Sequence, residues 1–137
     1  MPSYVWRSYS PFLVGNLIES IFFTRSRSLL RCLINEAIEM LEIAYASEKD
    51  DPYIIDSIGW AYYLVSDYIK AEKFLNRAVQ LMPDDPIVND HYGDILWKLN
   101  RKIQARYFWT NVLKMKDADE EMLKKINIKI VEGLKKS

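Results

Sequence analysis

Small and large apolar residues recur along this chain in a fixed order. Between residues 56 and 83 the order is small, aromatic, aromatic, small, aliphatic, small and proline, given by Gly59, Tyr62, Tyr68, Ala71, Leu75, Ala78 and Pro83. Two helices that cross closely need such an order, because a large side chain on one helix must meet a small one on the other. The pattern therefore predicts an antiparallel pair of helices at about 52–65 and 68–81, joined by a turn at Ser66 and Asp67.

This order returns with a period of 34 residues. Three pairs of positions share that spacing: Gly59 and Gly93, Ala71 and Ala105, and Leu75 and Trp109. Pro52 and Pro86 each follow two aspartates, and an aspartate followed by proline is typical of a helix start. The period predicts one repeat at 52–85 and a second at 86–119.

Residues 33–51 carry the pattern of a second helix alone, because Ala37, Leu41 and Ala44 precede Ala71, Leu75 and Ala78 by 34 residues. They are predicted to be the second helix of a degenerate repeat. The first helix of that repeat would lie at about 18–31.

The two ends of the chain depart from the period. Residues 1–32 are predicted to be a divergent N-terminal helical segment, whose apolar run at 11–23 keeps helical spacing. That run is shorter than the ~20 residues of a membrane span, and Glu19 interrupts it. Packing against the next helix is favoured, and a helix that lies on a membrane surface is left open.

Residues 120–137 are predicted to be a C-terminal capping helix that covers the last repeat. Its apolar stripe consists of Met122, Leu123, Ile126, Ile130 and Leu134. Four lysines are expected to face water: Lys124, Lys125, Lys129 and Lys135.

The pattern of Gly59, Tyr62, Ala71 and Ala78 with its 34-residue period resembles the tetratricopeptide repeat (TPR). The likeness covers about 33–135 and is specific across 52–113. DPYIIDSIGWAYYL and DPIVNDHYGDILWKLNRKIQARYFW are similar to the C-terminal repeats of proteobacterial TPR proteins, which are adaptors or scaffolds and often exported lipoproteins. The resemblance implies an all-α solenoid of antiparallel helix pairs in a right-handed superhelix, and a non-catalytic protein–protein interaction adaptor.

The chain departs from the family pattern at several positions. Arg25 stands where the small residue of a first helix belongs, and Lys102, Val112 and Asp117 replace an aromatic residue, an alanine and a proline. The N-terminal repeat is therefore incomplete by this measure, and the repeat at 86–119 is more degenerate than the one before it.

TPR arrays place the first helix of each pair on the concave side, so the resemblance also implies a binding groove. The positions carried over are Tyr53, Asp56, Trp60, Tyr63 and Leu64 in the first repeat and Ile87, Asp90, Asp94, Trp97 and Lys98 in the second. Such a groove is aromatic and acidic, and suits an apolar or basic peptide segment of a partner. Its carboxylates disfavour a partner's terminal carboxylate. Partial coverage of the groove by the N-terminal helix or by the C-terminal cap is left open.

Composition narrows the classes of partner. The 137 residues are half hydrophobic and carry a formal net charge of zero, so no bulk field draws the chain to nucleic acid or to membrane. Residues 33–51 have six acids and one lysine, whereas residues 98–116 have six basic residues and no acid. Nucleic-acid binding by the basic segment is disfavoured, because Phe108 and Trp109 fall on the packing face.

Catalytic and metal chemistry finds no support in the sequence. Cys32 is the sole cysteine, which excludes an intramolecular disulfide, and it is expected to be a small apolar filler. His91 lies beside Asp90 and Asp94, but these are too few ligands for a metal, and a solvated polar face is expected. No nucleophile with a base and no phosphate-binding loop is present, so no enzyme, cofactor or metal is predicted.

Location and wider context stay as alternatives. The lack of a signal peptide favours the cytoplasm of a bacterial cell, with a periplasmic or membrane-associated location left open. Two other interpretations are a membrane-peripheral assembly subunit anchored by residues 11–23 and a fragment of a longer TPR array.

Overall fold

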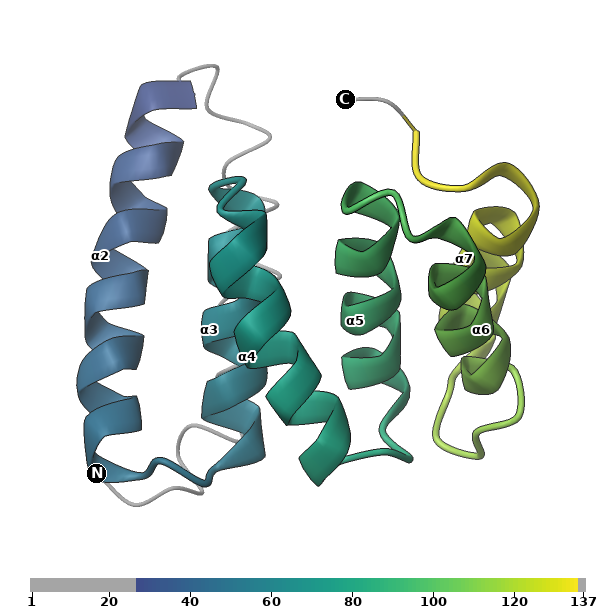
Figure 1. The fold of residues 1–137 in the computed structure, drawn as a ribbon, viewed down its shortest axis with the longest axis horizontal. Coiled ribbons are helices and arrows are strands. Elements are labelled where there is room, and N and C mark those ends of the chain that lie inside the picture. Colours follow the sequence, from purple (N-terminus) through teal and green to yellow (C-terminus); the bar gives the residue numbers. More distant parts are fainter. Residues whose placement is uncertain (1–26, 136–137) are drawn as a thin grey trace. The chain divides into compact units, whose positions relative to one another are not determined.

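The computed structural model describes residues 27–135, which form helices joined by short loops (Figure 1). The helices are α2 (Arg27–Ser47), α3 (Pro52–Leu64), α4 (Tyr68–Leu81), α5 (Pro86–Lys98), α6 (Lys102–Val112) and α7 (Glu120–Glu132). The predicted all-α class is confirmed. The chain divides into two compact units within α4. The first unit ends at Phe74 and the second begins at Leu75. The predicted helix at 11–23 lies outside the described residues.

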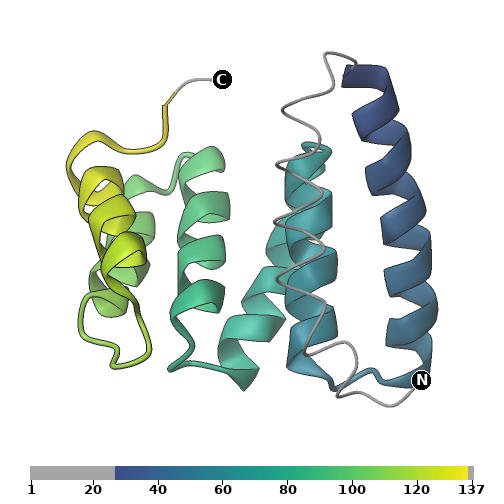
Figure 2. The same cartoon turned by 180° about the vertical axis from the view of Figure 1, so that it is seen from behind.

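In the N-terminal unit, α2 and α3 lie side by side and run antiparallel (Figures 1 and 2). Tyr62 of α3 is buried and donates its hydroxyl to Glu42 of α2 at 2.5 Å. Phe74 of α4 stacks on Tyr62 and meets the ring of Tyr45 edge-on, with ring centroids 5.9 and 5.6 Å apart. These aromatic contacts join the three helices of the unit.

Helix α2 begins earlier than the sequence pattern predicts. It starts at Arg27, so residues 27–31 do not belong to a separate preceding helix, and that part of the prediction is wrong. No glycine or proline lies between 27 and 33 to end a helix there. Cys32 is exposed on α2 and is not the buried filler that we expected.

The C-terminal unit is built around Trp109. Helices α5 and α6 pair closely, and α7 packs on α6 (Figure 2). Trp109 of α6 has no exposed surface, and its indole lies directly against Gly93 of α5. A side chain at Gly93 would occupy the space of that ring. The predicted close approach of a small and a large residue is therefore confirmed at this pair.

The 34-residue period is present in the backbone itself. Ser66 and Asn100 both take left-handed conformations, with φ of 65° and 63°, at the turns after α3 and α5. The following amides, of Asp67 and Arg101, donate to the carbonyls of Tyr62 and Leu96, respectively. Both turns thus close in the same way.

Helix starts follow this period as well. Asp51, Asp85 and Asp119 are the N-caps of α3, α5 and α7. The carboxylates of Asp51 and Asp85 each accept from two backbone amides of the first turn, and that of Asp119 accepts from the amide of Met122. Helix α7 is therefore in phase with the two first helices, a continuation that the sequence analysis did not recognise.

Helix α7 also ends earlier than predicted. Its C-cap is Gly133, with φ of 76° and ψ of −171°, a conformation that side chains strongly disfavour. Leu134 and Lys135 therefore lie beyond the helix, and the prediction that they continue its two faces is wrong.

Candidate functional site

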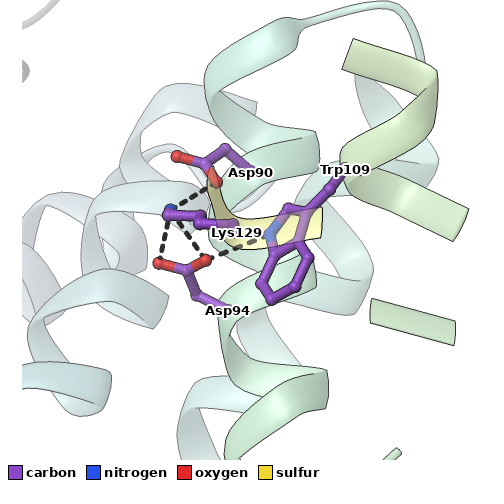
Figure 3. Close-up of polar contacts among 4 residues, drawn as sticks. All are labelled: Asp90, Asp94, Trp109 and Lys129. Atoms are coloured by element: carbon purple, nitrogen blue, oxygen red, sulfur yellow. Dashed lines mark hydrogen bonds and ion pairs between the residues drawn. The ribbon is translucent and has the colours of Figure 1, made fainter. Parts of the chain in front are cut away.

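Two carboxylates of α5 converge on one ammonium group of α7 (Figure 3). Lys129 Nζ lies 2.6 Å from Asp90 Oδ1 and 2.8 and 2.9 Å from the two carboxylate oxygens of Asp94. Asp90 and Asp94 are four residues apart on a helix, which places them one above the other on the same face. The three contacts are short enough to be charge-assisted hydrogen bonds.

Asp94 is the buried member of this group. Only 5% of its surface is exposed, and Trp109 Nε1 of α6 donates to its Oδ1 at 3.1 Å. The Lys129 side chain is 20% exposed. The expectation that Lys129 and the face around Asp94 are solvated is therefore wrong. Buried charges need a partner, and these groups supply one another.

The pKa values in this group follow from burial and from the two carboxylates. Burial raises the pKa of Asp94 to about 6, and the charge of Asp90 adds to the rise, while Lys129 and His91 act in the opposite direction. Burial alone would lower the pKa of Lys129, but Asp94 and Asp90 outweigh it and the net shift is upward. The pKa of Asp94 is thus shifted toward neutral pH.

We expect Asp94 to make the folded chain less stable as pH rises from 3.8, the ordinary pKa of an aspartate, to about 6. In this window the folded chain keeps a proton that the unfolded chain has lost, so this contribution is full below 3.8 and is lost above about 6. Urea unfolding of the chain and of Asp94→Asn at several pH values measures it. The variant should gain stability relative to the parent as pH rises, and exposed Asp84→Asn should not. A difference that is constant with pH would contradict the assignment.

Trp97 of α5 is enclosed by basic and aromatic groups. Its ring lies against Gly133 at the end of α7 and is 5.5 Å from the ring of Trp109. The Arg106 guanidinium lies 5.0 Å from the Trp97 ring centre, and Lys102 Nζ lies 5.3 Å from it. Helix α7 and two cations of α6 therefore cover part of this predicted binding residue.

On α3, the predicted aromatic residues form a stack of their own. Trp60 and Tyr63 are half-buried, with ring planes 9° apart and centroids 4.5 Å apart. Tyr68 of α4 lies 5.9 Å from Tyr63. Tyr53 and Asp56 of α3 are also half-buried. Trp60, Tyr63 and Tyr68 thus form one cluster of neighbouring rings within the N-terminal unit.

The remaining predicted residues lie at other points of these helices. Ile87 is 42% exposed near the start of α5, and Lys98 and Leu64 are half-buried at the ends of α5 and α3. The structure brings Asp90 and Asp94 together around one cation. A single groove shared by the α3 and α5 residues stays a prediction.

Sequence reasoning missed Lys129, Arg106 and Gly133 as parts of the site. A signal for Lys129 was present, because it stands 34 residues after Ile95 and 68 after Ala61, and both of these are buried. It also lies three residues after the buried Ile126, on the same helical face. Extension of the repeat period into α7 would have placed Lys129 inward.

Metal sites and membrane-spanning helices are two further features to consider in residues 27–135. Within that range no three side chains of the metal-ligating types gather in a way that could hold an ion. No helix in the same range has both the length and the apolar character that crossing a membrane requires.

Three curated proteins are similar to parts of this chain. TPR repeat-containing protein PA4667 of Pseudomonas aeruginosa is 37% identical over 59 residues, which is 43% of this chain and 10% of that protein. Protein bimA of Emericella nidulans is 28% identical over 90 residues, or 66% of this chain and 11% of that protein. Protein O-mannosyl-transferase TMTC1 of Mus musculus is 26% identical over 89 residues, or 64% and 9%.

The chain therefore spans about a tenth of the length of these relatives. No family model matches it. Nevertheless, the 34-residue period of its helices, caps and turns agrees with the repeat that the name of the Pseudomonas relative gives.

Proposed function

We propose that this chain, which is similar to TPR proteins, is a non-catalytic protein-interaction adaptor. In this proposal, a peptide or protein partner with an apolar or basic segment binds in a concave, aromatic and acidic groove. The groove is lined by the first helices of the repeats, through Tyr53, Asp56, Trp60 and Tyr63 of α3 and Ile87, Asp90, Asp94, Trp97 and Lys98 of α5. We propose no catalysed reaction for this chain.

The observation that carries the proposal is the binding of Lys129 by α5. Asp90 and Asp94 hold its ammonium group at 2.6–2.9 Å, while Trp109 donates to the same carboxylate of Asp94. A face that receives a lysine from its own chain has the groups needed to receive a basic side chain from another. Asp56 is the residue of α3 at the repeat position of Asp90.

The α3 surface supplies the aromatic part. Tyrosine and tryptophan dominate binding energies at protein interfaces, since their rings bury a large apolar area at a small cost in side-chain entropy. Trp60 and Tyr63 are stacked within 4.5 Å and so are already ordered. Order before binding reduces the entropy lost when a partner binds.

Panning a displayed peptide library on the immobilised full chain tests this function. We expect enrichment of peptides in which lysine or arginine is flanked by apolar residues. Trp60→Ala should weaken the selected peptides by about tenfold or more, the loss typical of a central aromatic residue. Ile69→Ala is the matched control, because Ile69 is a 73% exposed apolar residue of α4. Circular dichroism checks that both variants stay folded.

Three results would contradict the proposed function. The library could give no enriched peptide, or it could give acidic peptides and free C-terminal carboxylates. Alternatively, folded Trp60→Ala could bind the selected peptides as tightly as the control variant does.

A further inference from the structure

The carboxylates of α5 need a cation in order to stay buried. Without Lys129, Asp94 would keep the hydrogen bond from Trp109 Nε1 and the weaker influence of His91, and Asp90 would lie next to it with a like charge. Two carboxylates in this position with no cation are strongly disfavoured. Above the pKa of Asp94 the site therefore favours a bound ammonium or guanidinium group, but its chemistry does not require that the group belongs to α7.

Helix α7 has few apolar residues that hold it in place. Of its 13 residues only Ile126 is buried among the helix's own positions, whereas eight of the 13 residues of α5 are buried. Met122, Leu123 and Ile130 are half-buried. An element with little buried apolar surface opens locally at a lower free energy than the whole domain unfolds.

The polar contacts of α7 add a second anchor that another helix could reproduce. Lys129 provides the ammonium, and Arg106 Nε donates to the carbonyl of Ile130 at 2.9 Å, which is a backbone group that every sequence has. The requirements on a competing helix are therefore short: one lysine, an apolar residue three positions before it, and an apolar residue directly after it, as Ile126 and Ile130 are placed around Lys129.

We propose that α7 is a built-in competitor, and that the partner of this chain supplies a lysine-bearing amphipathic helix that displaces α7 from α5 and α6. This inference rests on the proposed function and specifies the partner segment for the α5 face. Exchange keeps the carboxylates paired throughout, because one lysine replaces another. The α5 face is then closed to other ligands until α7 is displaced.

A synthetic peptide of residues 119–135 with blocked ends is the probe, added in trans to the full chain. Hydrogen exchange of the α7 amides, residues 120–132, is measured with increasing peptide, which is isotopically labelled so that its own signals are distinguished. We expect saturable binding together with faster exchange in the chain's own α7. A peptide carrying Lys129→Met should bind at least about tenfold more weakly, since it cannot pair with Asp90 and Asp94.

Variants of the chain provide a second arm. Lys129→Met in the chain weakens the competitor, so the unaltered peptide should bind at least about tenfold more tightly than it does to the parent chain. Lys125→Met is the matched control and should leave binding unchanged, because that lysine is 67% exposed and pairs with Glu121 of its own helix at 2.7 Å. The exchange measurement on the parent chain needs no variant, so it remains informative if Lys129→Met does not fold.

Several outcomes would overturn the inference. The peptide could fail to bind, or the Lys129→Met peptide could bind equally well. Binding could also leave exchange in 120–132 unchanged, which would place the peptide elsewhere. If library panning still selects basic peptides in that case, the adaptor function stands and only displacement of α7 is wrong. A peptide-free dimer that exchanges α7 between two copies would also overturn it, because the occupant would then be a second copy of this chain.

Discussion

Replacement of Trp109 with alanine should lower the free energy of unfolding by about 3–5 kcal/mol. Trp109 has no exposed surface, and its ring fills the space between Gly93 and Trp97. Glycine has no side chain with which to refill the cavity. Asp94 would also lose the hydrogen bond from the indole nitrogen. Urea denaturation followed by circular dichroism measures the loss.

Two further variants separate the causes. Trp109→Phe keeps an aromatic ring but removes the hydrogen bond to Asp94, so its loss should be intermediate. Tyr107→Ala removes a 63% exposed aromatic residue of the same helix and should change stability by about 0.5 kcal/mol or less. A loss for Trp109→Ala no larger than that for Tyr107→Ala would show that the indole does not hold the C-terminal unit together.

Gly93→Ala should destabilise the chain by about 2 kcal/mol, although alanine is the better helix former. The added Cβ would collide with the indole of Trp109, which is buried on all sides and cannot move away freely. Helix propensity alone predicts the opposite sign, a gain of about 1 kcal/mol, so the direction of the measured change decides between the two effects.

A double-mutant cycle tests the cause of that loss. If the clash with the indole is responsible, Gly93→Ala should cost less in a Trp109→Phe background, where the smaller ring leaves room. The coupling should be about 0.5 kcal/mol or more, as found for residues in direct contact. Additive losses, or a more stable Gly93→Ala, would count against the steric explanation.

Much of the fold follows from local signals that the sequence states directly. The predicted helices at 52–65 and 68–81 agree with α3 and α4 to within one residue, because an aspartate cap and a proline mark the start of α3 and a turn with left-handed Ser66 marks its end. The start of α2 was misplaced because no such signal lies near residue 33. Prediction succeeded for α3 and α4, which a cap and a turn mark, whereas the glycine that ends α7 was overlooked.

The site was less predictable, since it depends on compensation between helices. One residue judged degenerate in the second repeat has a partner in the structure. Lys102 takes the repeat position of Tyr68 and faces Trp97 as a cation, at the positions where Tyr63 and Tyr68 pair as rings. A substitution that breaks a sequence pattern can thus preserve the contact.

The position of the tryptophan also differs between the two repeats. At one repeat position the first repeat has Trp60 and the second has Asp94. At another, the first has Leu75 and the second has Trp109. The tryptophan therefore belongs to the first helix of the first repeat and to the second helix of the second repeat. The indole in the core then donates to the aspartate that replaced it. This pairing joins two residues that are 15 apart in the sequence and lie on different helices, so it cannot be inferred from either residue alone.

The hydrogen bond from Arg106 to the carbonyl of Ile130 has a consequence for variation in this chain. The acceptor belongs to the last turn of α7, where carbonyls have no partner within the helix. Because the arginine donates to a main-chain carbonyl, the hydrogen bond does not depend on the side chain at position 130. We therefore expect aliphatic replacements at position 130 to keep this bond, whereas replacement of Arg106 removes it.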